Sequence, residues 1–197
     1  MTRPRLVFPV ILLLAGCGSS PETHYYKLSV VGAEATHAAP TAAPVQVTAV
    51  HLPPSLDRLE RVVQSGPNRV QLSDQERWSA PLDEMARDVL SQDLRARLPP
   101  GAVVMPDAPA PKNTRQIVVS VAQFGPNADG EVELTGDWSL LKPGTDDVIG
   151  RQPVSLRTPA GRDADSQVGA MSRLLGQLAA QIASATGTDV KNRKPPA

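Results

Sequence analysis

The 197-residue chain is electrically balanced, with 20 basic and 20 acidic side chains and a formal net charge of zero. This balance leaves no basic stripe for a phosphate backbone, which argues against nucleic acid as a partner. The length is enough for one domain with a sizeable core and short of two comfortable ones. We therefore expect a single domain that does not bind nucleic acid.

The N-terminal segment has the order of regions that is typical of a secretory signal. Arg3 and Arg5 precede an apolar run at residues 6–14, which is about half of the roughly 20 residues that a membrane-spanning helix needs. The stretch Leu14-Ala15-Gly16-Cys17 resembles the bacterial lipobox, where lipoprotein signal peptidase cleaves before the cysteine. We expect residues 1–16 to be a signal peptide that is removed. An ordinary secretory signal that happens to contain a cysteine is the alternative.

Cys17 is the only cysteine of the chain, so it has no partner for an internal disulfide or for a cysteine-rich zinc site. As the acylated first residue of the mature protein, it would carry two or three chains and meet the two-signal requirement for stable membrane anchorage. The small and polar residues that follow make 17–23 a tether. We therefore expect lipidation at Cys17 and a folded domain over residues 24–186.

The first half of this expected domain contains strand-like segments followed by a helix. Residues 45–52 alternate apolar and polar side chains and end at a proline pair, which predicts a half-buried strand. The turn residues Ser65-Gly66-Pro67-Asn68 predict a hairpin between two short runs. The strands expected in this half are 25–30, 45–52, 60–64 and 69–72, with a low-complexity loop at 32–44.

A helix is predicted over residues 81–98. Pro81 suits a first helical turn, with Ser79 or Ala80 as the cap and acidic residues after it to complement the helix dipole. The helix ends at the Pro-Pro-Gly stretch at 99–101, and a short strand at 102–105 follows. One apolar stripe indicates the buried face: Leu82, Met85, Val89, Leu90, Leu94 and Leu98.

The second half repeats this order. Residues 116–124, 131–141 and 148–156 are predicted strands separated by turns rich in glycine, proline and aspartate. A helix over 165–186 has a narrow apolar seam, which packs either on the protein's own sheet or on another subunit, and its own sheet is the simpler choice. The polar tail at 187–197 is expected to be disordered.

The order of these elements predicts an α+β fold. We expect a largely antiparallel or mixed sheet with two long amphipathic helices packed on it. Strands followed by a helix occur twice, which suggests a β-β-β-α duplication in element order, without sequence identity between the halves that would prove it.

No arrangement of residues typical of a catalytic or metal site is present. The sequence lacks a nucleophile elbow, a phosphate-binding loop, a dinucleotide fingerprint and a zinc-protease motif. The histidines, at positions 24, 37 and 51, fall in a tether, a loop and a strand end. Turn formation and helix capping account for Asp146, Asp147, Asp163 and Asp165. We therefore expect no enzyme activity, no metal and no cofactor; a hydrolase with a dispersed site is a remote alternative.

One loop combines stiffness with mixed chemistry. Leu52-Pro53-Pro54-Ser55-Leu56-Asp57-Arg58 leaves a strand through two prolines, and rigid loops are suited to presenting contacts. The alternative is that Asp57 and Arg58 pair locally while Leu56 covers a sheet edge. Arg77 and Trp78, before the helix, form a similar candidate, although a tryptophan there is more often part of the core with the arginine stacked or paired beside it.

These residues carry a family resemblance. The Tyr25-Tyr26-x-Leu28 strand behind the lipobox, the loop with Leu52, Pro53, Leu56, Asp57 and Arg58, Asn68 after the turn, and Arg77-Trp78-x-x-Pro81-Leu82 together resemble the PqiC/YmbA family. The likeness spans about residues 17 to 98, and the second half agrees in element order. Two departures are Ser55, where the family commonly has an aromatic residue, and Leu59, where it often has proline.

The resemblance implies the auxiliary lipoprotein component of an ABC-type or MCE-domain transport system. Such a protein is non-catalytic, lies at the outer membrane facing the periplasm, and works beside an inner-membrane MCE protein that conducts lipid; members are also associated with ring assemblies. Gly18 after the cysteine agrees with outer-membrane placement. The residues implied in partner binding are Leu52, Pro53, Leu56, Asp57, Arg58, Arg77 and Trp78. A general envelope lipoprotein that binds another periplasmic protein or peptidoglycan is the alternative function.

Overall fold

The computed structural model describes residues 21–32, 43–66 and 68–188. The predicted signal peptide, Cys17, most of the low-complexity loop and residues 189–197 of the predicted tail lie outside these ranges. The elements of the described chain are β1 (His24–Tyr26), β2 (Val45–His51), β3 (Glu60–Gly66), β4 (Arg69–Trp78), α1 (Leu82–Arg97), β5 (Val103–Val104), β6 (Arg115–Pro126), β7 (Glu131–Leu141), β8 (Val148–Pro159) and α2 (Ala164–Thr188).

The strands form two sheets of different size. The large sheet has the order β5-β2-β6-β7-β8, in which β2 is parallel to both β5 and β6, and β6, β7 and β8 are antiparallel. The small sheet has the order β1-β4-β3, with β1 parallel and β3 antiparallel to β4. The predicted α+β fold with a mixed sheet is thus confirmed. The two halves share their element order, but β3 and β4 pair away from the large sheet.

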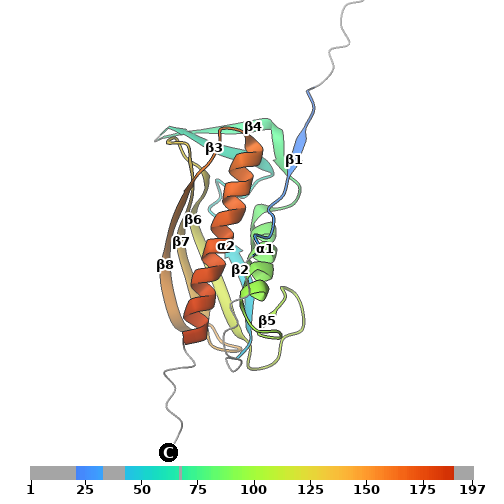
Figure 1. Ribbon diagram of the computed structural model, residues 1–197, viewed down its shortest axis with the longest axis vertical. Helices are drawn as coiled ribbons and strands as arrows, with labels where there is room; N and C mark the ends of the chain where they lie inside the picture. The colour runs from blue at the N-terminus through green and yellow to red at the C-terminus, as the bar shows by residue number, and fades with distance from the viewer. Residues whose placement is uncertain (1–20, 33–42, 67, 189–197) are drawn as a thin grey trace, which may run out of the picture.

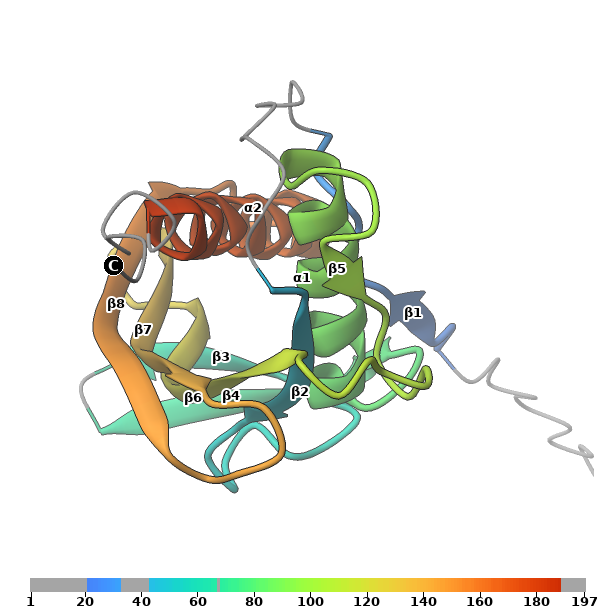
Figure 2. The same cartoon turned by 90° about the horizontal axis from the view of Figure 1, so that it is seen from below.

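Two helices lie over the concave face of the curved large sheet, while the small sheet crosses one end of the molecule (Figures 1 and 2). α1 packs on β2 and β5, α2 packs on β6, β7 and β8, and the helices contact each other. The predicted packing of the second helix on its own sheet is confirmed. The seam residues Val168, Met171, Leu175, Leu178 and Ile182 all lie in the core.

The large sheet follows its sequence pattern closely. In β2 the apolar residues Val45, Val47 and Val50 are buried, and a register shift after Val47 keeps Val50 in the core. Gly136 of β7 has φ of 151°, and a Cβ atom there would clash with the carbonyl oxygen of Ser120 on β6. Only glycine therefore allows β6 and β7 to approach at this point.

The first predicted strand, residues 25–30, is too long. β1 ends at Tyr26, because the backbone beyond it bonds to helix side chains instead of a strand. The Ser29 N–H donates to the Ser172 hydroxyl at 3.1 Å, and the Val31 N–H donates to the Asp93 carboxylate at 3.1 Å. The segment after β1 is therefore held against α1 and α2.

The hairpin prediction is confirmed, but its second strand is longer than 69–72. β4 continues to Trp78, because its last residues pair with β1 and not only with β3. Arg77 and Trp78 thus end a strand and do not belong to a loop. The predicted cap is also wrong. Pro81 is the N-cap residue of α1, so neither Ser79 nor Ala80 is the cap, and no side chain makes a capping hydrogen bond.

The last strand of the large sheet, β8, has no strand on its outer side within the described chain. Its twelve residues include Pro153 and Pro159 and the exposed Arg151 and Arg157. Proline in a strand is characteristic of sheet edges, because it cannot donate a ladder hydrogen bond.

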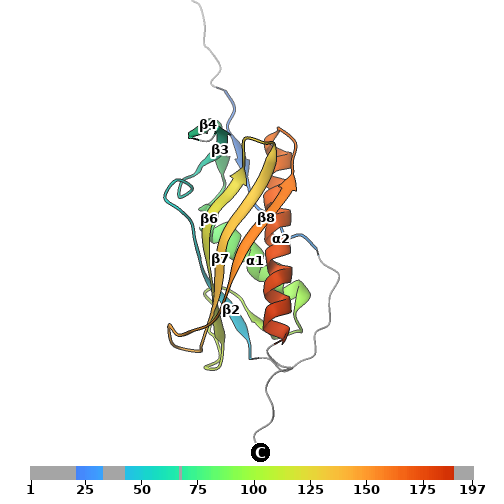
Figure 3. The ribbon, with the colours of Figure 1, turned by 90° about the vertical axis from the view of Figure 1, so that its left-hand side faces the viewer.

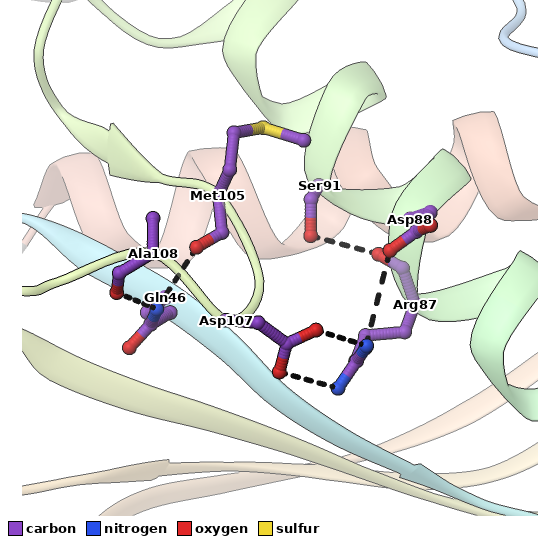
Figure 4. A network of polar contacts seen from close by, with 7 residues as sticks. All are labelled: Gln46, Arg87, Asp88, Ser91, Met105, Asp107 and Ala108. Atoms are coloured by element: carbon purple, nitrogen blue, oxygen red, sulfur yellow. Dashed lines mark hydrogen bonds and ion pairs between the residues drawn. The ribbon is translucent and has the colours of Figure 1, made fainter.

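A polar network fixes the connection between β5 and β6 (Figure 4). The Arg87 guanidinium of α1 donates to both oxygens of Asp107, at 2.7 and 3.3 Å. The Gln46 amide of β2 donates to the carbonyls of Met105 and Ala108, at 2.9 and 3.2 Å. These bonds hold the connection against α1 and β2, so the network has a structural role.

Candidate docking site

The loop between β2 and β3 lies on the flank of the molecule opposite α2 (Figures 2 and 3). Two backbone hydrogen bonds between residues close in sequence shape it. The Leu56 N–H donates to the Pro53 carbonyl at 2.9 Å, and the Arg58 N–H donates to the Leu56 carbonyl at 2.9 Å. The loop is therefore a defined turn, as its prolines predict, and it can present side chains in a fixed arrangement.

The loop has an inner and an outer side. Leu52 and Leu56 are half-buried and pack against the core, whereas Asp57 and Arg58 are exposed and Leu59 is 45% exposed. Among the described residues no ion pair or hydrogen bond joins Asp57 to Arg58, so the local pairing considered above is not formed. An acid, a base and an aliphatic side chain are thus presented side by side to the solvent.

The end of β4 braces this loop from behind. The backbone N–H of Trp78 donates to the Leu59 carbonyl at 2.7 Å, and Trp78 is only 4% exposed. Arg77 forms an ion pair with Glu60, and its side chain remains 40% exposed. A backbone N–H and then the Arg77 guanidinium hold the pKa of Glu60 below its usual range. Trp78 therefore belongs to the core, and Arg77 extends the exposed surface of the loop.

Next to this surface lies a buried cation. Arg61, at 2% exposure, donates to the Glu76 carboxylate and to the Gln167 side-chain oxygen, both at 2.6 Å, and its guanidinium lies 5.4 Å from the centre of the Tyr26 ring. Burial, then the carboxylates of Asp165 and Glu76, raise the pKa of Tyr26. Arg61 thus ties β3 to β4, α2 and β1.

Sequence reasoning missed this cluster. Arg61 stands in a strand among polar and apolar residues, where an arginine is usually exposed. Its partners come from three other elements, and Gln167 is 106 positions away. No pattern among neighbouring residues predicts such a site.

A second concave feature lies beside the chain start. A groove of about 860 Å³ runs between residues 22–31 and the first turns of α2. Tyr25, Lys27, Asp165 and Arg173 line it together with Val30 and Val168. Its chemistry is mixed, and the bonds from Ser29 and Val31 described above fix its wall.

The described part of the chain includes His24 and His51, two of the three histidines that were candidates for a metal site. No group of three or more histidine, cysteine or acidic side chains is placed to hold a metal ion within that part of the chain. His24 and His51 lie in different sheets, on β1 and at the end of β2, while His37 is outside the described ranges. None of the helices described is both long and apolar enough to cross a membrane.

The fold is an α+β domain with a braced and exposed loop, and comparison with known families identifies its class. Residues 26–183 match the family described as ABC-type transport auxiliary lipoprotein component, so the chain belongs to that family. The match continues through the second half of the chain, where the resemblance seen in the sequence was limited to the order of the elements.

Curated relatives agree with this assignment. The chain is 29% identical over 182 residues to the intermembrane transport lipoprotein PqiC of Escherichia coli and, to the same extent, to that of Shigella flexneri. The alignment covers 90% of this chain and 94% of either relative. The resemblance inferred from the sequence is thereby confirmed.

Solved structures support the fold. One, described as an uncharacterized protein, aligns with a TM-score of 0.70 at 24% identity and covers 84% of this chain and 99% of its own. A protein from Xanthomonas campestris aligns with a TM-score of 0.64 at 15% identity, covering 86% of this chain and 100% of its own. At this identity the likeness concerns the fold alone.

Proposed function

We propose that this protein is a non-catalytic lipoprotein of the outer membrane, anchored through Cys17 and facing the periplasm. It serves an intermembrane transport system for phospholipid or another hydrophobic compound by docking to an MCE-domain protein of the inner-membrane complex. Membership of the auxiliary lipoprotein family and the likeness to PqiC support this proposal.

Docking uses the loop formed by residues 52–59 together with Arg77. The observation that carries this assignment is the exposed trio Asp57, Arg58 and Leu59 on a backbone that Trp78 fixes from behind. A braced loop loses little conformational entropy on binding, and a mixture of charge and aliphatic surface suits a protein partner. Leu52, Pro53, Leu56 and Trp78 support the loop, whereas Asp57, Arg58 and Arg77 make the contacts.

Photocross-linking in cells tests the proposal. A photoreactive residue replaces Arg58, and a matched probe replaces the exposed Asp146 in the turn between β7 and β8. We expect mass spectrometry to identify an MCE-domain protein among adducts from position 58 and not from position 146.

Three other outcomes would contradict this docking role. Capture of other copies of the chain alone would make the loop an assembly contact. Capture of the MCE protein from position 146 alone would move the docking surface to the opposite end. No adduct from either position, with co-sedimentation of the protein with peptidoglycan, would favour the general envelope function.

A further inference from the structure

The described chain starts at one end of the elongated molecule. Residues 21–23 leave β1 at the end crossed by the small sheet, and α2 ends at the other (Figure 1). Six residues lie between Cys17 and His24, and the seven steps from one Cα atom to the next span at most about 25 Å when fully extended. α2 has 25 residues, which corresponds to a length of about 37 Å. A lipid on Cys17 therefore holds the start of β1 within about 25 Å of the membrane, a distance shorter than the length of α2.

The small sheet exposes apolar side chains at this end. Tyr25 is 67% and Val70 is 59% exposed, the two highest values among the large hydrophobic side chains that the structure describes. Tyr25 of β1 pairs in register with Arg77 of β4, and Arg77 pairs with Glu60 of β3. Val70 pairs with Gln64, which is four residues from Glu60, or about 13 Å along β3. The two exposed groups thus lie at opposite sides of one broad surface.

Their neighbours suit the boundary between water and lipid. Arg69 is exposed beside Val70, and Tyr25 carries a phenolic hydroxyl of its own. A tyrosine, or an aliphatic residue with an adjacent arginine, presents an apolar body together with a polar group that stays with the head groups. Each contact contributes little binding energy, but the anchor raises the effective concentration of the sheet at the bilayer. Weak contacts can therefore determine how the domain is oriented on the membrane.

We propose that the small sheet rests on the phospholipid surface of the membrane that holds Cys17. Tyr25 enters the head-group region next to the anchor, and Val70 enters it at the hairpin end. The long axis of the domain then points away from the bilayer, and the turn between β7 and β8 faces the aqueous space. This inference rests on the lipid anchor at Cys17 proposed above.

Site-specific fluorescence quenching tests the orientation with the full lipoprotein. The lipid of a processed lipoprotein is attached to the Cys17 sulfur, so an engineered cysteine is the only free thiol. V70C is labelled with a polarity-sensitive dye and reconstituted into vesicles of phosphatidylethanolamine and phosphatidylglycerol with and without nitroxide lipid. The matched control is V148C, at a valine that is 51% exposed and lies at the start of β8, toward the far end.

The expected result is a loss of about twofold in dye intensity at position 70 with nitroxide lipid, as for a group at the head-group boundary, and no loss at position 148. Adding Tyr25→Ser should weaken quenching at position 70, because one of the two contacts is lost. Circular dichroism of each variant should match that of the unsubstituted protein, since all these positions are exposed.

Several results would overturn the proposal. An unquenched dye at position 70 on vesicle-bound protein would show that the sheet stays off the membrane. Equal quenching at both positions would show a domain lying flat. Quenching that grows with protein density and does not depend on nitroxide would assign the surface to contacts between copies. Failure of the protein to float with the vesicles would instead remove the anchor itself, and with it the proposed function.

Discussion

The two sheets of this protein are held in place by different forces. The large sheet and its helices share a continuous apolar core that draws buried residues from almost every element. In the small sheet only Arg61 and Trp78 are buried. The large sheet is therefore stabilised by removal of apolar surface from water, whereas the small sheet joins the rest through one buried tryptophan and the charged cluster around Arg61. The comparison indicates a rigid body carrying a more easily loosened end.

The largest effect should come from the apolar core. Leu90 of α1 has 0% exposure, so Leu90→Ala should reduce the free energy of unfolding by about 2–5 kcal/mol through lost burial and a residual cavity. Urea denaturation followed by circular dichroism measures the loss. The same truncation at the 45% exposed Leu59 is the control and should change stability by about 0.5 kcal/mol or less. Equal effects at the two positions would contradict the assignment of the core.

A smaller effect should follow from Arg61→Met. The variant keeps most of the apolar stem but leaves Glu76 and Gln167 without their donor. Because the Glu76 side chain is 32% exposed and can hydrate, we expect a loss of about 1–3 kcal/mol, less than for a completely buried pair.

Hydrogen exchange locates this effect of Arg61→Met. Amides of β3 and β4 should exchange faster, while those of β7 should remain protected. Arg77→Met is the matched control, since its ion pair with Glu60 is partly exposed and should contribute little to stability. Uniform acceleration across both sheets would show that the small sheet is not a separate unit of opening.

The contact between the segment after β1 and α1 should depend on pH through Asp93. Asp93 is buried, one of its oxygens has no hydrogen-bond partner, and it accepts bonds from Val31 and Arg97. Burial raises the pKa of Asp93 above its ordinary 3.8, although Arg97 acts in the opposite direction. The folded state therefore binds the proton more tightly than the unfolded state does.

The sign of the pH effect follows from that difference. The contribution of Asp93 to stability is complete below its ordinary pKa of 3.8 and is lost as the pH rises through the higher folded value. Asp93→Asn cannot titrate, so the unfolding free energy of the unsubstituted protein should fall relative to that of the variant as the pH rises. Urea denaturation at a series of pH values measures this difference; a constant difference would contradict the raised pKa.

Patterns confined to one segment predicted much of the fold. Alternation in β2, turn residues in the hairpin and the apolar seam of α2 all rest on neighbours in the sequence, and each is found in the structure. The full length of β4 was missed because its polar residues 73–77 have little strand preference, and the end of the strand is held by pairing of residues 76–78 with β1.

The candidate site was predicted only in part. Prolines mark the loop at 52–59 as stiff, and the exposure of Asp57 and Arg58 agrees with a contact surface. The burial of Arg61 and Trp78 depends on partners from distant segments, and the mixed pairing of β1, β3 and β4 creates their setting. Tertiary contacts of this kind leave no periodic signal in the sequence.

The outer edge of β8 has a consequence for the proposed anchorage on a bilayer. Molecules held on a bilayer meet far more often than the same number in solution, and an open strand invites them to join edge to edge. Pro153 and Pro159 interrupt that edge because neither has a backbone N–H to donate. Arg151 and Arg157 are exposed on the same strand and pair with Asp137 and Glu133 of β7. These features disfavour edge-to-edge pairing of β8 between neighbouring copies.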